Sequence, residues 1–154
     1  MLGINELNSL IEEFNAKEQK LKAEEEEAKK EEVARQFKFI NDFKDVKNNE
    51  IKPNISELVQ CLNKAIGIKA NVNYVQKDLE TIGNFEGIEI EIVREDNSNL
   101  SVKISPNIFK ETVICSVDRN PGFGDDKKFE MQLKDFNNTW LNDFVISEFK
   151  KFIS

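Results

Sequence analysis

The chain contains no glycine and no proline between Ile4 and Lys52, so this stretch can form one uninterrupted helix. In its middle, twelve of the sixteen residues from Lys17 to Glu32 are lysine or glutamate. A helix that is charged on all sides has no apolar face to bury in a core of its own. The sequence therefore predicts a long polar helix that either extends away from a folded domain or pairs with another helix.

The first turns of this helix carry apolar residues at the a and d positions of a heptad repeat. Leu21 and Ala28 continue the same phase, but Glu18 and Glu25 occupy the a positions between them. Because acids pack poorly at a positions, we expect a coiled coil that is tight at its start and loose further on. The expected self-association residues of a homodimer are Ile4, Leu7, Ile11 and Phe14.

Glutamate-to-lysine pairs at a spacing of four residues support the helix where packing does not. Each such pair stabilises an isolated helix by about 0.2–0.5 kcal/mol. The pairs are Glu13–Lys17, Glu18–Lys22, Glu25–Lys29 and Glu26–Lys30.

A second apolar stripe leaves the heptad phase and predicts a segment that docks on the folded domain. Its members are Val33, Phe37, Ile40, Phe43 and Val46. We therefore expect residues 1–46 to form the helical part. A break at residues 47–50, followed by Pro53, predicts that a compact domain spans residues 53–154.

The predicted domain is α+β, an antiparallel meander of about five strands covered by helices. A helix is expected from Asn54, capped by its own side chain and ended by Gly67. A last helix with an aromatic stripe begins at Asn138 or Thr139. A polar loop is expected from Gln76 to Gly87. Alternating apolar residues predict strands near residues 68–74, 88–92, 100–104, 112–117 and 129–133.

Composition narrows the classes of partner and compartment. A net charge of −7 and only three arginines argue against direct nucleic-acid binding, which needs clustered positive charge. No apolar run reaches the length of a membrane span, and the first residues do not resemble a signal peptide, so we expect a cytoplasmic protein with no membrane contact. Cys61 and Cys115 fall on predicted core faces and are expected to be buried free thiols.

Catalytic signatures are not evident. The chain has no histidine, which excludes Ser-His-Asp machinery and the common zinc sites, and it has no glycine-rich phosphate loop. We therefore name no catalytic residue, cofactor or metal. The acids around the first hairpin are more typical of a solvated strand face than of acid–base chemistry: Glu86, Glu89, Glu91, Glu95 and Asp96.

The loop after residue 118 supplies candidate residues for binding a partner. It begins like a calcium loop, but Gly122 and Phe123 break the EF-hand pattern. Phe123 stands between two glycines and either folds onto the core or anchors a partner. The partner-binding candidates are Arg119, Phe123, Asp125 and Asp126.

The function that best fits these features is a non-enzymatic adaptor that self-associates through its first helix and binds another protein. The alternative is a small acidic inhibitor encoded by a phage and directed at a bacterial nuclease or defence complex, in the manner of an anti-CRISPR protein. Small size, acidity and a bias toward asparagine, lysine and isoleucine favour that alternative. A carboxylate- or metal-dependent enzyme is the third hypothesis.

Overall fold

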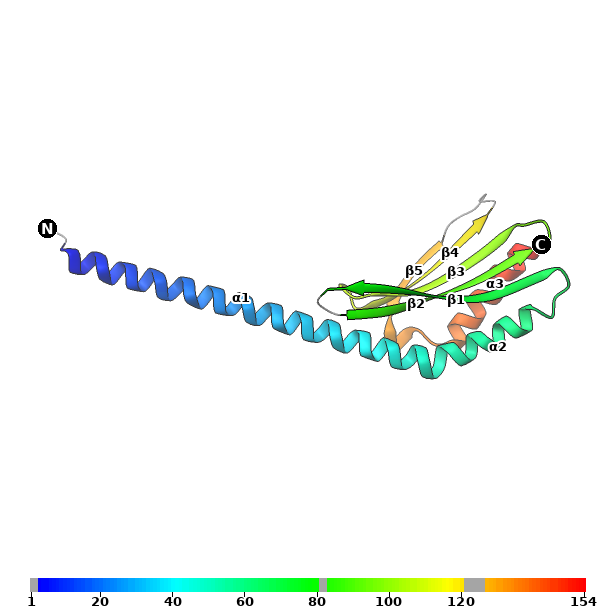
Figure 1. Ribbon diagram of the computed structural model, residues 1–154, viewed down its shortest axis with the longest axis horizontal. Coiled ribbons are helices and arrows are strands. Elements are labelled where there is room, and N and C mark those ends of the chain that lie inside the picture. The colour runs from blue at the N-terminus through cyan, green and yellow to red at the C-terminus, as the bar shows by residue number, and fades with distance from the viewer. Residues whose placement is uncertain (1–2, 81–82, 121–126) are drawn as a thin grey trace. The chain divides into compact units, whose positions relative to one another are not determined.

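The computed structural model describes residues 3–80, 83–120 and 127–154 (Figure 1). It contains two compact units, Met1–Arg35 and Gln36–Ser154. The helices are α1 (Ile4–Val46), α2 (Lys52–Leu62) and α3 (Asn138–Ile153), with a π turn η1 (Lys47–Ile51) and a 3-10 turn η2 (Leu133–Asp135). The strands are β1 (Ile68–Leu79), β2 (Gly83–Arg94), β3 (Asn99–Asn107), β4 (Thr112–Asn120) and β5 (Lys127–Gln132). The predicted α+β class, with a five-stranded meander and a long charged helix, is confirmed.

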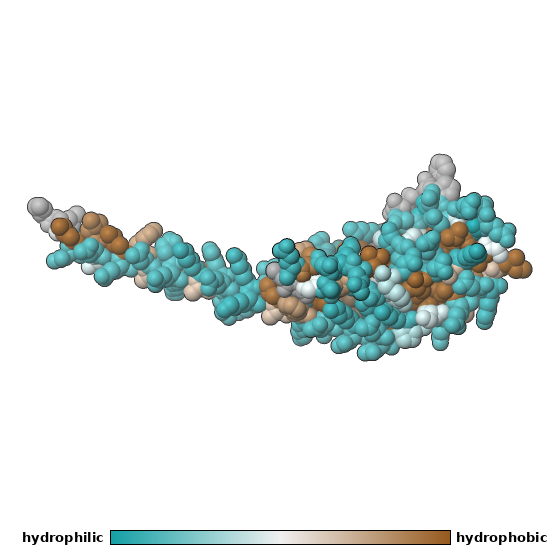
Figure 2. Space-filling view, viewed as in Figure 1, coloured by the Kyte–Doolittle hydropathy of each residue, from teal (hydrophilic) through white to brown (hydrophobic). Residues whose placement is uncertain are grey.

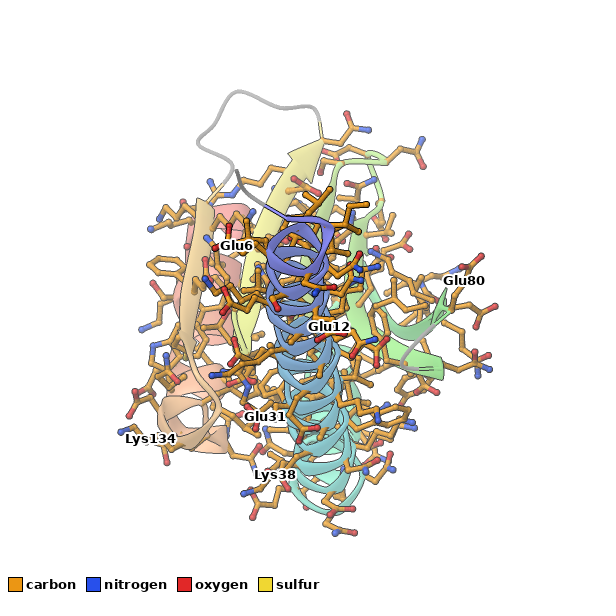
Figure 3. All side chains as sticks on the ribbon, turned by 90° about the vertical axis from the view of Figure 1, so that its left-hand side faces the viewer. Glu6, Glu12, Glu31, Lys38, Glu80 and Lys134 are labelled. Atoms are coloured by element: carbon orange, nitrogen blue, oxygen red, sulfur yellow. The ribbon has the colours of Figure 1, made fainter. Side chains whose placement is uncertain are left out.

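The first unit is helical, and every described side chain from residue 3 to residue 32 is exposed. Figure 3 shows Glu6 and Glu31 on one side of the helix and Glu12 on the other. This exposure follows from the sequence, because a run of lysine and glutamate offers no apolar stripe wide enough to pack on a core.

The second unit is built on an antiparallel sheet with the strand order β1-β2-β3-β4-β5. The register aligns inward residues across the sheet: Ile90 lies opposite both Val72 and Val102, and Val102 lies opposite Val117. Ile90, Val102 and Val117 are buried, whereas their immediate neighbours along each strand are polar or partly exposed. One face of the sheet therefore belongs to the core and the other faces solvent.

Helices α2 and α3 cover the apolar face (Figure 1). Ile55 of α2 and Leu141 and Val145 of α3 are buried in the core cluster together with the inward strand residues. Trp140 stacks on Phe144 with ring centroids 5.0 Å apart. The aromatic stripe of the last helix thus covers the sheet, as its spacing predicts.

The predicted break at residues 47–50 is wrong, because the chain remains helical there in the form of the π turn. The buried residues Phe43, Lys47, Ile51 and Ile55 are each four positions apart. In an α-helix four residues turn about 400°, so a four-residue spacing drifts by about 40° at each step. The wider π turn takes up this drift and keeps the four side chains on one face. Pro53 is tolerated because it stands in the first turn of α2.

The docking stripe differs from the predicted one by a rotation of the helix. Within the second unit, Gln36, Phe39, Ile40 and Phe43 are buried, whereas the expected Phe37 is exposed. Three residues predicted as inward are confirmed: Ile40 and Phe43 are buried, and Val46 is partly buried against the core. Phe39 and Gln36 take the place of Phe37 on the buried face.

The hairpin formed by β1 and β2 is longer than its sequence suggests. The polar loop expected from Gln76 to Gly87 is wrong: β1 continues to Leu79, and Gln76 lies opposite Glu86 in the ladder. Its polar side chains mislead because residues 73–78 of β1 are exposed on both faces, so burial does not impose an apolar alternation there.

Two helix caps also differ from expectation. The Asn54 side chain does not cap α2 but donates to Asn142 Oδ1 at 2.7 Å, which joins α2 to α3. The cap of α3 is Asn137, whose Oδ1 accepts from the Trp140 N–H at 2.9 Å.

The open edge of β1 is closed at one point by a side chain. Asn63, just after α2, accepts from the Ala70 N–H at 2.7 Å and donates to the Ala70 carbonyl oxygen at 3.0 Å. The amide thus pairs with Ala70 as a neighbouring strand would.

Both cysteines are free, but only one is buried. Cys115 lies in the core, and burial raises the pKa of its thiol to about 12. The expected burial of Cys61 is wrong, because this residue lies on the exposed side of α2. Cys61 stands next to the apolar Leu62 near the end of a short amphipathic helix. The sequence pattern therefore did not show which of the two side chains faces the core.

We expect one thiol per folded chain to react with Ellman's reagent in mildly alkaline buffer, and the second only after denaturation. The thiolate is the reactive form, and the Cys115 thiol is both buried and held protonated. Cys61→Ser is the control and should abolish the fast reaction. Two fast thiols in the wild-type chain would contradict this assignment.

Candidate functional site

The candidate site in the first unit is the apolar face of the first turns of α1. The helix carries the four predicted self-association residues along one side, and all of them are 47 to 78% exposed. They are Ile4, Leu7, Ile11 and Phe14. The structure confirms the helix that aligns them, and pairing between copies stays a prediction.

Leu10 widens this face and was missed by the heptad pattern because it is neither an a nor a d residue. It is 61% exposed and precedes Ile11 on the flank of the stripe. We call Ile4, Leu7, Leu10, Ile11 and Phe14 the N-terminal seam. Figure 2 shows apolar side chains gathered at this end of the helix, next to a run of polar ones. Exposed apolar side chains that adjoin one another are typical of an interaction surface.

Arg119, the described member of the predicted partner-binding group, is engaged within the second unit. Its Nη2 donates to Glu148 Oε2 at 2.7 Å. Lys127 Nζ donates to Glu148 Oε1 at 3.1 Å, and Lys151 Nζ lies 3.6 Å from the same oxygen. The remaining candidates, Phe123, Asp125 and Asp126, lie outside the described residues.

Glu148 is the residue that sequence reasoning missed. It lies on the inward face of α3, three and seven positions after Val145 and Leu141, and its side chain is only 3% exposed. A carboxylate on an otherwise apolar helix face was the available signal, because a buried acid needs a cationic partner. The resulting Glu148 cluster, with Arg119, Lys127 and Lys151, joins α3 to β4 and β5.

Electrostatics in the cluster favour the ionised carboxylate. Burial raises the pKa of Glu148, but hydrogen bonds from Arg119 and Lys127 and the charges of Lys127 and Lys151 outweigh burial and hold the pKa below its ordinary value. A depressed pKa in the folded state means that protons bind more readily to the unfolded chain.

We therefore expect Glu148 to stabilise the fold above the ordinary glutamate pKa of about 4.3, and this contribution to be lost as the pH falls through the lower folded-state pKa. Melting temperatures measured from neutral pH down to about pH 3 test this. The Glu148→Gln variant should lose less of its melting temperature than the wild type over this range, whereas Asp143→Asn should follow the wild type. Parallel curves for all three chains would rule out the assignment.

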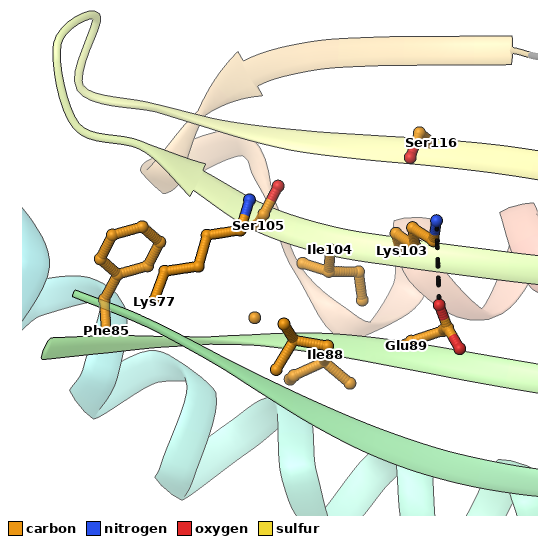
Figure 4. Close-up of a pocket in the computed structure, with 10 residues that line it drawn as sticks. Lys77, Phe85, Ile88, Glu89, Lys103, Ile104, Ser105 and Ser116 are labelled. Atoms are coloured by element: carbon orange, nitrogen blue, oxygen red, sulfur yellow. Dashed lines mark ion pairs between the residues drawn. The ribbon is translucent and has the colours of Figure 1, made fainter. Parts of the chain in front are cut away.

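A hollow of about 270 Å³ opens on the polar side of the sheet (Figure 4). Gly87 lines the hollow, and the backbone approaches it closely, since a Cβ at this position would lie 3.3 Å from the Ile104 carbonyl oxygen. Lys103 borders the hollow but is compensated by Asp118 at 3.3 Å and Glu89 at 3.9 Å. Its lining combines apolar residues such as Phe85 and Ile104 with polar ones such as Lys77 and Ser105.

A buried lysine connects the π turn to the sheet. Lys47 Nζ donates to the Glu86 carbonyl oxygen at 3.3 Å and lies 3.8 Å from Glu86 Oε1, to which Lys52 is closer at 3.0 Å. Burial lowers the pKa of Lys47, against the attraction of Glu86, which raises it. Since its ammonium is enclosed, Lys47 holds the π turn to β2 and is not accessible to a ligand.

In the part of the chain that the structure describes, no three cysteine, aspartate or glutamate side chains are grouped to hold a metal ion. Among the same residues, no helix combines the length and the apolar character that crossing a membrane requires.

Comparisons with family models, with curated proteins and with solved structures found no match to this chain.

Proposed function

We propose that this chain is a non-enzymatic interaction protein, an adaptor that self-associates as a homodimer through its first helix and binds another protein. The observation that carries this proposal is the N-terminal seam, in which five large apolar side chains of one helix are all exposed. A single copy leaves them in water, whereas a second copy of the same helix offers a matching apolar face.

The energetics support a moderate association. Complete burial of one such side chain contributes about 1.5–3 kcal/mol. Ordering two chains costs an estimated 4–15 kcal/mol, so several seam residues must be buried together before a stable pair results. Five of them on one face of each helix fulfil that condition.

The second unit offers a separate surface for the other partner. Ile66 is fully exposed in the turn after α2 and borders a hollow that Phe149 and Ile153 also line. Exposed apolar groups near charged ones are typical of a protein-binding surface. The free thiols Cys61 and Cys115 support a reducing compartment, the cytoplasm, and the net charge of −7 supports a protein partner over nucleic acid.

Sedimentation of the full chain tests the proposal. At tens of micromolar we expect a species of twice the 17.8 kDa chain mass. A monomer under these conditions would overturn self-association. Capture of a basic target whose binding weakens steeply with salt would instead favour the acidic inhibitor.

A further inference from the structure

The proposed self-association leaves the direction of pairing open, and the distribution of acids along α1 bears on it. The four a positions are Ile4, Ile11, Glu18 and Glu25, and the four d positions are Leu7, Phe14, Leu21 and Ala28. Acids thus occupy only the a column, whereas the d column is apolar throughout.

A parallel pair would bring each a residue against the same residue of the second copy. Glu18 would then face Glu18, and Glu25 would face Glu25, inside the contact. Lys17 at the g position would also lie near Lys22 at the e position of the second copy. Like charges in such layers are destabilising, and the glutamates would in addition lose water.

An antiparallel pair avoids every one of these contacts between acids. When the chain direction reverses, each a residue meets a d residue of the second copy, so Glu18 and Glu25 can only meet apolar side chains. Several antiparallel registers are possible, and they differ in which a residue meets which d residue. The longest register in which every facing pair is apolar places Ile4 against Phe14 and Leu7 against Ile11. By symmetry, each of these pairs occurs twice in the dimer. In this register Leu10 also lies on the same flank as Leu10 of the second copy, and Glu18 stays in water.

We propose that two copies of this chain pair antiparallel through residues 4–14, in the register that places Ile4 against Phe14 of the second copy. This inference rests on the proposed self-association and specifies its geometry. It also accounts for Leu10, which would face Asn15 in a parallel pair but an apolar neighbour in the antiparallel one.

Disulfide trapping in the full chain separates the two directions. Ile4→Cys and Phe14→Cys are each introduced into a Cys61→Ser chain and oxidised with diamide, alone and as a mixture. The equivalent residues of two copies lie ten positions apart in the proposed register, about 15 Å along the axis at 1.5 Å per residue, which is beyond disulfide reach. We expect a mixed Ile4→Cys/Phe14→Cys disulfide by mass spectrometry and no dimer from either variant alone.

The outcomes distinguish the failure of the register from the failure of self-association. Disulfide dimers from each variant alone would show a parallel pair and overturn the inference while leaving the homodimer in place. A wild-type dimer whose variants give no disulfide at all would overturn this register. A wild-type monomer in sedimentation would overturn the proposed function and the inference together.

A second measurement needs no cysteine. Glu18→Gln should leave the dimer dissociation constant within about twofold of wild type in the antiparallel register, because residue 18 lies outside the contact. A parallel pair would tighten on the same substitution, since a layer of facing glutamates would be neutralised. A Glu18→Gln dimer that is tenfold tighter would therefore overturn the antiparallel pairing.

Discussion

Glutamate at both Leu7 and Ile11 is expected to abolish self-association. The two substitutions remove apolar side chains from the centre of the N-terminal seam and place charges in layers that exclude water. With about 1.5–3 kcal/mol lost for each buried side chain, the dissociation constant should rise more than about a hundredfold. Sedimentation at concentrations that keep the wild-type chain dimeric measures the change.

A matched control separates the loss of the seam from the added charge. Ser9 and Ala16 lie at f positions, on the side of the helix away from the a and d columns. Ser9→Glu with Ala16→Glu adds the same two charges and should leave the dimer intact. If both double variants dissociate alike, repulsion between chains and not loss of the seam is responsible, and a dimeric Leu7→Glu/Ile11→Glu chain would exclude the seam altogether.

Removal of the Glu148 carboxylate is expected to cause the largest loss of stability among single substitutions of charged residues. Glu148→Ala leaves Arg119 and Lys127 without their buried counter-charge. Breaking a fully buried ion pair costs about 3–5 kcal/mol, and since these cations are partly exposed, about 2–3 kcal/mol is expected here. Chemical denaturation followed by circular dichroism measures the free energy of unfolding.

Asp143→Ala provides the control for this prediction. Asp143 lies on the same helix but is exposed, so its loss should change the free energy of unfolding by less than about 0.5 kcal/mol. Equal losses for the two variants would show that the Glu148 cluster adds nothing specific to the fold.

The sequence predicted the elements whose signal is local. A glycine- and proline-free run gave the long helix, and alternating Ile88, Ile90 and Ile92 gave an inward strand face, because periodicity in a chain reports which side is buried. Short turns between successive strands then led to the meander. The same reasoning gave the a and d residues of the seam, but not Leu10.

Features that depend on contacts between distant residues were not predicted. Glu148 and Arg119 are 29 positions apart, and neither is unusual in its own segment. The π turn allows four residues to be buried on one surface: Phe43, Lys47, Ile51 and Ile55. Local helix propensities do not predict such a turn. Cys61 was placed inward because a short helix allows more than one apolar face.

The amide of Asn63 has a consequence for how the sheet stops growing. A twelve-residue edge strand is a template on which another extended chain can polymerise, and natural sheets limit this by covering or interrupting such edges. Asn63 occupies the N–H and the carbonyl oxygen of Ala70, so an incoming strand cannot form hydrogen bonds with the edge at this residue. One side chain, supplied by the end of a helix, thus helps keep a fold with an open sheet from becoming the seed of an aggregate.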